Sequence, residues 1–313
     1  MADAARRFAG NLDAVGAEAR RARLKGVGLM LAALACFCCL DTTAKILNGR
    51  MDTVQVVWAR YVFHFLLTLP FINPWNTPGL MRTARPGLQV GRALMLLACT
   101  ACNFVALIFL QLDETISITF TTPFLVAILA GPILGEWVGP KRMAAILVGF
   151  LGVLIVTRPG LGGLHWAAGI AFLGCVAYAL YLVSTRVLAR HDPTTTTLFY
   201  SGLVGVVVMT PAAPFFWTWP SAVDWGLMAM LGALGGLGHF LLIAAYRLAP
   251  AAVLAPFIYC QLIGMIALGY VVFGDVPTGW TLAGASVVIA SGLYLLMRER
   301  RTKPVAATIA RPD

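Results

Sequence analysis

Long apolar runs separated by short polar stretches make up most of the chain. Each run holds about 20 mostly apolar residues, which as a helix rising about 1.5 Å per residue crosses about 30 Å of hydrocarbon. Continuous runs favour helices, because the strands of a membrane barrel alternate apolar and polar residues over about ten positions. The pattern predicts ten membrane-spanning helices, at residues 25–47, 54–72, 88–110, 115–134, 141–157, 166–188, 195–216, 224–246, 251–273 and 278–297.

The composition supports a chain that lies almost wholly in a membrane. Of its 313 residues, 60% are apolar and only 12% are charged, whereas soluble domains have about a quarter of their residues charged. Apart from polar tails at residues 1–24 and 299–313, the predicted helices leave no room for a soluble domain. The fold class that we expect is therefore all-α integral membrane.

The net charge of +10 indicates membrane topology rather than a nucleic-acid partner. If the N-terminus is cytoplasmic, the cytoplasmic segments hold all of the 23 lysines and arginines except Lys45, Arg50, Arg60 and Arg158. Positive residues concentrate on the cytoplasmic side of membrane proteins, where they contact anionic lipid head groups. The distribution predicts a multi-pass protein of a bacterial-type inner membrane with both termini in the cytoplasm.

The cysteines give no sign of a metal, a cofactor or a disulfide. All seven fall within predicted helices. Cys99 and Cys102 have the spacing of a redox or metal pair, but they lack a second pair and neighbouring histidines, so packing is the better interpretation. The apolar stretch at 25–47 has no cleavage site behind it, and we expect that helix to remain in the protein.

The two halves of the chain share a pattern. Residues 121–158 and 258–298 each contain an apolar run, a glycine followed by an acid, a short loop with glycine and proline, and a helix that ends near an arginine. Five helices per half is an odd number, which places the second copy upside down relative to the first and predicts a central cavity between them. The expected organisation is a cytoplasmic tail at 1–24, a first five-helix repeat at 25–158, an inverted repeat at 159–298 and a cytoplasmic tail at 299–313.

In these features the chain resembles the drug/metabolite transporter superfamily, in its EamA-type branch. The resemblance rests on the ten helices, on the Gly-Glu step that ends the fourth helix, and on the segments DTTAKIL, VVWARYVFH and FGDVPTGWTLAGASVVIASGLYLLMRER. It covers almost the whole chain between the polar tails. It implies a central cavity surrounded by the first, third, fourth, sixth, eighth and ninth helices, and a substrate such as a vitamin, a nucleoside-like metabolite or an amino acid.

Ionisable side chains inside the predicted helices are candidates for function, because a charge in a bilayer costs at least a few kcal/mol. Asp41 and Lys45 share one face of the first helix, and Arg60 and His64 share one face of the second. An ion-pair cluster of Asp41 with Lys45 or Arg60 would form an outer gate, with a surplus cation that attracts an anionic substrate. The alternative is a structural pair that braces the two helices, with the lysine reaching outward.

Uncharged polar and aromatic side chains complete the predicted binding site. Aromatic rings with a few polar groups form small-molecule pockets. Each such residue also has a local interpretation, because serines and threonines bond their own helix one turn back and a lone histidine is commonly a packing residue. Together with Arg60 and His64, the predicted substrate-binding residues are Asn103, Thr119, Tyr178, Tyr181, His239, Tyr259 and Gln261.

Prolines and glycines predict where helices bend and approach one another. Proline lacks a backbone N–H and frees a carbonyl, which permits kinks in the fourth and ninth helices. We expect Pro123 and Pro256 to act as hinges. Glycines let a neighbouring helix approach the eighth helix closely, and these are Gly232, Gly235, Gly236 and Gly238.

The hypothesis that joins these features is a secondary transporter that carries a planar or amphiphilic small molecule across the inner membrane by alternating access. The chain has no Gly-x-x-x-x-Gly-Lys-Ser/Thr loop for ATP. Because Asp41 is the only acid well inside a predicted helix, exchange or potential-driven transport is favoured over proton coupling. A lipid-linked flippase is the alternative, a membrane-embedded transferase is a weaker one, and no enzyme activity is expected. A monomer suffices, and a homodimer is compatible.

Overall fold

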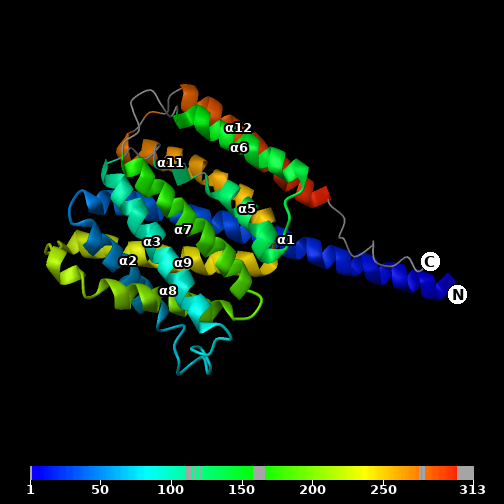
Figure 1. The fold of residues 1–313 in the computed structure, drawn as a ribbon, viewed down its shortest axis with the longest axis horizontal. Helices are drawn as coiled ribbons and strands as arrows, with labels where there is room; N and C mark the ends of the chain where they lie inside the picture. Colours follow the sequence, from blue (N-terminus) through cyan, green and yellow to red (C-terminus); the bar gives the residue numbers. More distant parts are fainter. Residues whose placement is uncertain are drawn as a thin grey trace.

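The computed structural model describes the backbone of residues 2–109, 115, 118–119, 121–157, 166–274, 276 and 279–301, which form helices and connecting loops without a strand (Figure 1). The first half contains α1 (Ala2–Asn48), α2 (Thr53–Thr68), α3 (Pro86–Phe109), α5 (Thr122–Leu134) and α6 (Pro140–Thr157). The second half contains α7 (Ala167–Leu188), α8 (Thr194–Met209), η1 (Ala213–Phe216), α9 (Ala222–Leu248), α10 (Ala251–Leu254), η2 (Ala255–Cys260), α11 (Gln261–Leu268), η3 (Gly269–Phe273) and α12 (Gly279–Arg301).

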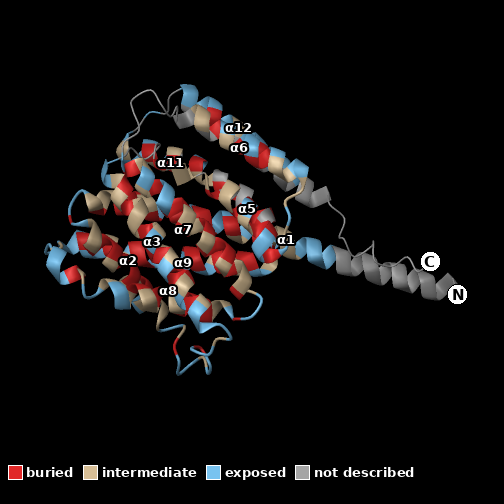
Figure 2. Cartoon of the chain, viewed as in Figure 1, coloured by how far each residue is buried: buried red, intermediate tan, exposed pale blue. Residues whose placement is uncertain are grey.

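Several of these helices are long and apolar enough to cross a membrane. They are Ala17–Asn48, Pro86–Phe109, Ala167–Leu188 and Ala222–Leu248, each with a mean hydropathy of 1.9. Shorter apolar helices lie in four more of the predicted ranges, at Phe124–Leu134, Thr194–Met209, Gln261–Phe273 and Leu282–Ser291. Many large apolar residues are exposed, among them Leu66, Leu151, Leu173 and Val271. Figure 2 shows exposed positions, in pale blue, along the helices as well as in the loops. A helix that is apolar on its outer as well as its inner face is typical of a lipid environment.

Helix boundaries follow local sequence signals. Asp52 caps α2 by accepting a hydrogen bond from the Val54 N–H at 2.7 Å. Ser221 and Asp224 form a capping box at the start of α9. The apolar segments α5 and η3 end in the same way, at Gly135 with φ +70° and at Gly274 with φ +72°. Only glycine adopts this left-handed conformation without steric cost, so the two shared Gly-acid steps are helix stops.

The ninth predicted range differs from the single helix that the apolar run at 251–273 suggested. It consists of the short α10, the 3₁₀ segment η2, the helix α11 and the π-helical segment η3. Pro256 lies within η2, where its missing N–H removes one rung of an α-helical ladder. Pro123 lies in the first turn of α5, a position at which proline is tolerated. The side chains of both prolines lie outside the part of the chain that the structure describes, and their hinge role stays a prediction.

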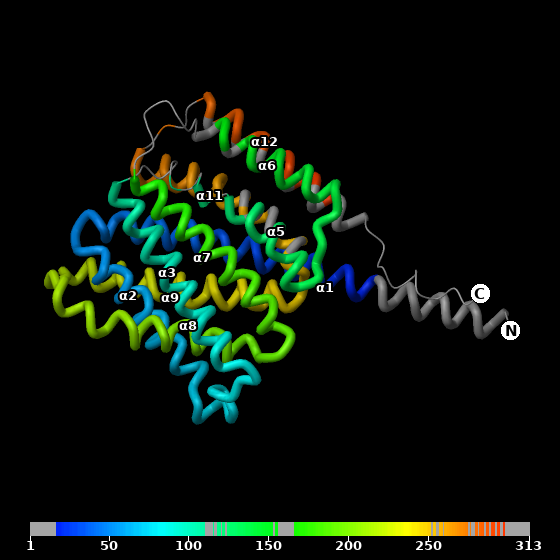
Figure 3. The backbone as a smooth tube through the Cα atoms, viewed as in Figure 1, coloured from blue at the N-terminus to red at the C-terminus, as the bar shows by residue number. Residues whose placement is uncertain are grey.

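The helices pack in pairs that join the two halves. The most extensive pairs are α1 with α9, α3 with α7, α6 with α12, and α2 with α9. Figures 1 and 3 show α6 and α12 side by side along one edge of the bundle. Glycine permits the closest approach, because a Cβ at Gly232 would overlap Phe63 and one at Gly238 would lie 2.6 Å from the ring of Phe37. The predicted role of these α9 glycines in close packing thus has a direct structural basis.

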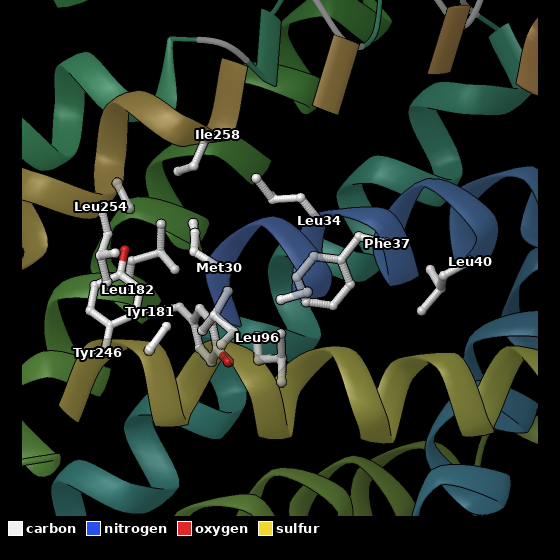
Figure 4. Close-up of a cluster of buried hydrophobic side chains, with 14 of the residues drawn as sticks. Met30, Leu34, Phe37, Leu40, Leu96, Tyr181, Leu182, Tyr246, Leu254 and Ile258 are labelled. Carbon is white, nitrogen blue, oxygen red and sulfur yellow. The ribbon is translucent and has the colours of Figure 1, made fainter. Parts of the chain in front are cut away.

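The apolar core extends through helices of both halves, and Figure 4 shows the part of it formed by α1, α3, α7, α9, α10 and η2. In Figure 4, Met30 and Phe37 of α1 lie on the side of Leu96 of α3 and Tyr181 of α7, whereas Leu34 points to the side of Ile258. All of these side chains are at most 8% exposed. This core forms one side of the polar cavity described next, since Phe37 and Leu96 belong to both.

Candidate functional site

A cavity lies among the helices of both halves. Its walls come from α1, α2, α3, α7, α9 and α11, with two residues that precede α5, and it holds about 890 Å³ of space free of protein atoms, counting its open mouth. Aromatic and polar groups line it, as small-molecule sites require. The lining consists of Phe37, Leu40, Asp41, Arg60, Leu96, Cys99, Thr100, Asn103, Phe104, Leu107, Thr115, Thr119, Ala171, Gly174, Cys175, Tyr178, His239, Gln261 and Met265.

Arg60 of α2 is the cation of the cavity wall, and it is 5% exposed. Its guanidinium donates to the Thr100 hydroxyl, to the Tyr61 hydroxyl at 3.4 Å and to Nε2 of His239 at 2.8 Å. Among the described residues, its Nε–H has no hydrogen-bond partner. All of its acceptors are uncharged, and no ion pair joins it to a carboxylate within the described part of the chain.

The hydrogen bond from Arg60 determines the tautomer of His239. Arginine can only donate, so Nε2 of His239 must carry the lone pair and the proton must lie on Nδ1. That Nδ1–H donates to the Tyr181 hydroxyl oxygen at 2.9 Å. The same oxygen accepts from the Arg92 guanidinium, also at 2.9 Å. A continuous chain of hydrogen bonds thus links two arginines through a neutral histidine and a tyrosine.

Arg92 of α3 is a residue whose place the sequence analysis missed. It was counted among the cytoplasmic charges, but it is 1% exposed and lies between α3, α7 and α8. Its Nε donates to Thr185 at 2.7 Å and its NH1 to Ser201 at 2.7 Å. Its guanidinium also lies 4.4 Å from the centre of the Tyr181 ring. A signal was present, since Arg92 falls inside the predicted span 88–110 rather than in a loop.

Asp41 and Lys45 of α1 have separate partners. Asp41 lines the cavity and accepts a hydrogen bond from the Gln261 side chain at 3.3 Å. Lys45 places its Nζ 4.5 Å from the centre of the Phe273 ring, in a cation–π contact. Among the described residues, no ion pair joins either one to the other or to Arg60.

The other predicted site residues lie in or next to the cavity where they are described. Asn103, Thr119, Tyr178, His239 and Gln261 line it. Tyr181 and His64 are buried behind the wall, with Tyr178 and Tyr181 stacked at 5.8 Å between ring centres. The Nε2 atom of His64 has no partner in the described structure. The side chain of Tyr259 lies outside the described residues. The aromatic wall residues Phe37 and Phe104 were not anticipated, because apolar rings within apolar helices carry no sequence signal.

Ion pairs tie helices together at the two ends of α9. At one end, Glu136 accepts from Arg186 at 2.9 Å and from Arg190 at 3.0 Å, and it also accepts from the Ala251 N–H at 2.8 Å. These contacts join the end of α5 to the end of α7 and to the segment that follows α9. At the other end, Arg50 after α1 pairs with Asp224 in the first turn of α9 at 2.8 Å.

Comparisons with known proteins agree with this architecture. A solved crystal structure superimposes with a TM-score of 0.73, covering 90% of this chain and 98% of the other at 16% sequence identity, which shows a shared fold. The chain is 26% identical to an S-adenosylmethionine uptake transporter of Rickettsia felis, over 91% of this chain and 96% of that protein. It is 27% identical to a riboflavin transporter of Rhizobium johnstonii, over 93% and 97%.

Family assignment follows from two consecutive matches along the chain. The pattern of the EamA-like transporter family matches residues 24–158 and again residues 165–298. The two matches cover almost all of the sequence, and they confirm the resemblance that the sequence motifs indicated. The relatives are named as transporters rather than as enzymes. The chain belongs to the EamA-like transporter family and is a membrane transporter of small molecules.

Proposed function

We propose that this protein is a secondary transporter that carries a planar or amphiphilic small metabolite across a bacterial inner membrane by alternating access. In this proposal ten membrane-spanning helices form two inverted five-helix repeats, at 25–158 and 159–298, around the central cavity. Both termini are cytoplasmic, as the distribution of lysine and arginine predicts. Vitamins, nucleoside-like metabolites and amino acids are the substrate classes.

The pairing of helices supports the inverted repeats. The first helix of each half packs against the third of the other, as α1 with α9 and α3 with α7. The second helices pack together as α2 with α8, and the last as α6 with α12. Each contact thus has a counterpart with the halves exchanged, which is the arrangement that a pseudo-two-fold axis produces.

The observation that carries the proposal is a polar cavity whose wall is divided between the halves. Arg60 and Asp41 come from the first half, and Tyr178 and His239 come from the second. Relative movement of the halves would therefore change access to the site without dismantling either one. The ion pairs of Glu136 and of Arg50 lie at opposite ends of α9, where such movement would open and close contacts.

The relatives suggest which molecules to test. S-adenosylmethionine and riboflavin are different compounds, but each contains a flat nitrogen heterocycle. Phe37, Phe104 and Tyr178 give the cavity aromatic surfaces of the kind that bind such rings. These two compounds are therefore the first candidates for transport by this chain.

The test is uptake by the full-length protein in proteoliposomes. Labelled S-adenosylmethionine and riboflavin are each supplied outside, with unlabelled compound inside, and uptake is compared with protein-free liposomes. We expect at least one compound to exchange, and we expect Asn103→Trp to abolish exchange because the indole fills the cavity. Leu94→Trp on the outer face of the same helix is the matched control and should retain it. Uptake by Asn103→Trp at the wild-type rate would contradict the proposal.

A further inference from the structure

Two opposite charges face the cavity from neighbouring segments of the chain. Arg60 lies on α2 and Asp41 lies on α1, and both belong to the cavity wall. Within the described residues they form no ion pair with each other, so neither charge neutralises the other by direct contact. A site that holds a separated cation and anion is complementary to a ligand that carries both.

The charge of Arg60 has no anionic partner in the described structure. Its acceptors are the Thr100 and Tyr61 hydroxyls and the ring of His239, and its Nε–H has none. A buried charge is costly unless a counter-ion compensates it. A carboxylate is the natural partner, because a guanidinium binds its two oxygens through charge-assisted hydrogen bonds. The missing anion is therefore one that a ligand can bring.

The carboxylate of Asp41 likewise has no cationic partner in an ion pair within the described structure. It accepts a hydrogen bond from the Gln261 amide at 3.3 Å, which is long for a hydrogen bond to a charged group. The adjacent hydroxyls of Thr42 and Thr43 donate to carbonyls of their own helix, at 2.9 and 2.8 Å. Lys45, one turn away, lies over the Phe273 ring instead.

We propose that the cavity selects a zwitterion: Arg60 binds its carboxylate, Asp41 binds its cationic group, and the rings of Phe37, Phe104 and Tyr178 contact its apolar body. This inference rests on the transport function proposed above and narrows its substrate to amino-acid-like compounds. A neutral solute leaves both wall charges without a partner, and a simple anion or cation leaves one. All three should bind more weakly than the zwitterion.

The experiment measures binding to the purified full-length protein, independently of transport. The probes are S-adenosylmethionine and tryptophan, the methyl ester of each, the decarboxylated amine of each, indole-3-propionate and riboflavin. S-adenosylmethionine and tryptophan each carry a carboxylate and an ammonium group. For at least one of them, we expect the dissociation constant to be about tenfold or more lower than that of its ester or amine, as one charge-assisted interaction requires. We also expect tryptophan to bind more tightly than indole-3-propionate, if tryptophan is the zwitterion that binds.

Variants assign the two charges. Arg60→Gln should reduce the preference for free acid over ester to about onefold, while Arg60→Lys retains part of it because the positive charge remains. Asp41→Asn should weaken binding of the compound that carries both charges. It should also reduce the preference of the site for the cationic ester over a neutral compound. Arg82→Gln, at an exposed arginine outside the cavity wall, is the control and should keep the wild-type preference. Size-exclusion elution and the unfolding midpoint identify any variant that misfolds. If Arg60→Gln misfolds, the preference of Arg60→Lys for acid over ester becomes the test of Arg60.

The outcomes separate this inference from the transport proposal. Equal binding of acid and ester by the wild type, tightest binding by riboflavin, or binding by none of the probes overturns the zwitterion site. Riboflavin exchange in proteoliposomes without charge-selective binding would support the proposed transport function and overturn the zwitterion site. Charge-selective binding without exchange of any bound probe supports the site and contradicts transport.

Discussion

The guanidinium of Arg60 donates to Nε2 of His239 across 2.8 Å, joining residues that are 179 positions apart in the sequence. Arg60 belongs to the first family match and His239 to the second. Because arginine cannot accept, this contact holds the histidine in one neutral tautomer and directs its Nδ1–H to Tyr181. The contact therefore determines the direction of the hydrogen bonds that link the two halves along the polar wall.

Replacing His239 tests how much these hydrogen bonds stabilise the protein. His239→Phe removes the acceptor of Arg60 and the donor of Tyr181, and we expect it to destabilise the protein by about 2 kcal/mol or more, since a buried charged donor loses a partner. His239→Gln supplies a side-chain oxygen in place of Nε2 and should lose less. The measurement is the unfolding midpoint of the purified protein. His191→Gln, at an exposed histidine, serves as the control. A phenylalanine variant as stable as the wild type would refute the structural role of the contact.

Arg92 should matter more for stability than any exposed arginine. It is 1% exposed and donates to Thr185, Ser201 and Tyr181. Arg92→Met leaves these groups without their donor, and we expect a loss of about 2–4 kcal/mol. Arg92→Lys keeps the charge but not the planar array of donors, so its loss should be intermediate. Thermal unfolding measures both, with Arg82→Met at an exposed position for comparison. Equal midpoints for Arg92→Met and Arg82→Met would show that the buried network contributes nothing.

Two glycines of α9 provide a matched pair. At Gly232 a Cβ would overlap Phe63 and the backbone of His64, so Gly232→Ala must push α2 away from α9. At Gly226 an added Cβ meets nothing within 4 Å. Alanine is favoured over glycine in a helix by about 1 kcal/mol. We therefore expect Gly232→Ala to lower the unfolding midpoint and Gly226→Ala to leave it unchanged or raise it. The reverse order would mean that α2 and α9 do not approach as closely as described.

The two arginines on Glu136 should contribute unequally. The Arg186 side chain is 15% exposed and that of Arg190 is 47% exposed. Solvent weakens an exposed ion pair to at most about 1 kcal/mol, whereas removing one partner of a buried pair costs about 3 kcal/mol or more. We expect Arg186→Gln to be the more destabilising, by about 1–3 kcal/mol given its partial exposure, and Arg190→Gln to have a small, salt-sensitive effect. Unfolding midpoints at low and high salt measure the difference. Equal effects would place both arginines in the same environment.

Much of the architecture could be read from the chain alone. A bilayer offers no hydrogen bonds to the backbone, so spanning segments must be helices and must be apolar, and both requirements are visible in the local sequence. Most of the apolar runs accordingly coincide with helices between α1 and α12. The range 251–273 is broken, α8 ends at Met209 rather than at 216, and α1 extends back to Ala2 into the predicted tail. The Gly-acid steps also marked real helix ends, because Gly135 and Gly274 adopt the left-handed conformation.

The arrangement of polar groups could be predicted only in part. Six of the predicted substrate-binding residues, among them Asn103, Tyr178 and Gln261, line the cavity together with Asp41. The partners were not predictable: Asp41 contacts Gln261 and Lys45 contacts Phe273, where direct pairing with each other or with Arg60 was one expectation. The rotation of each helix about its axis decides such pairings, and that rotation depends on packing at glycines in other helices.

The sequence by itself therefore determined that this is a helical membrane transporter of the EamA-like family, which segments of it are apolar and helical, and which charges need an explanation. Only the tertiary structure decided that the Arg92 side chain is buried between helices, and that Arg60, His239 and Tyr181 meet. The physical reason is one of range. Hydropathy and helix capping act within a few turns of one helix, whereas a buried hydrogen bond joins residues that become neighbours only when the helices pack.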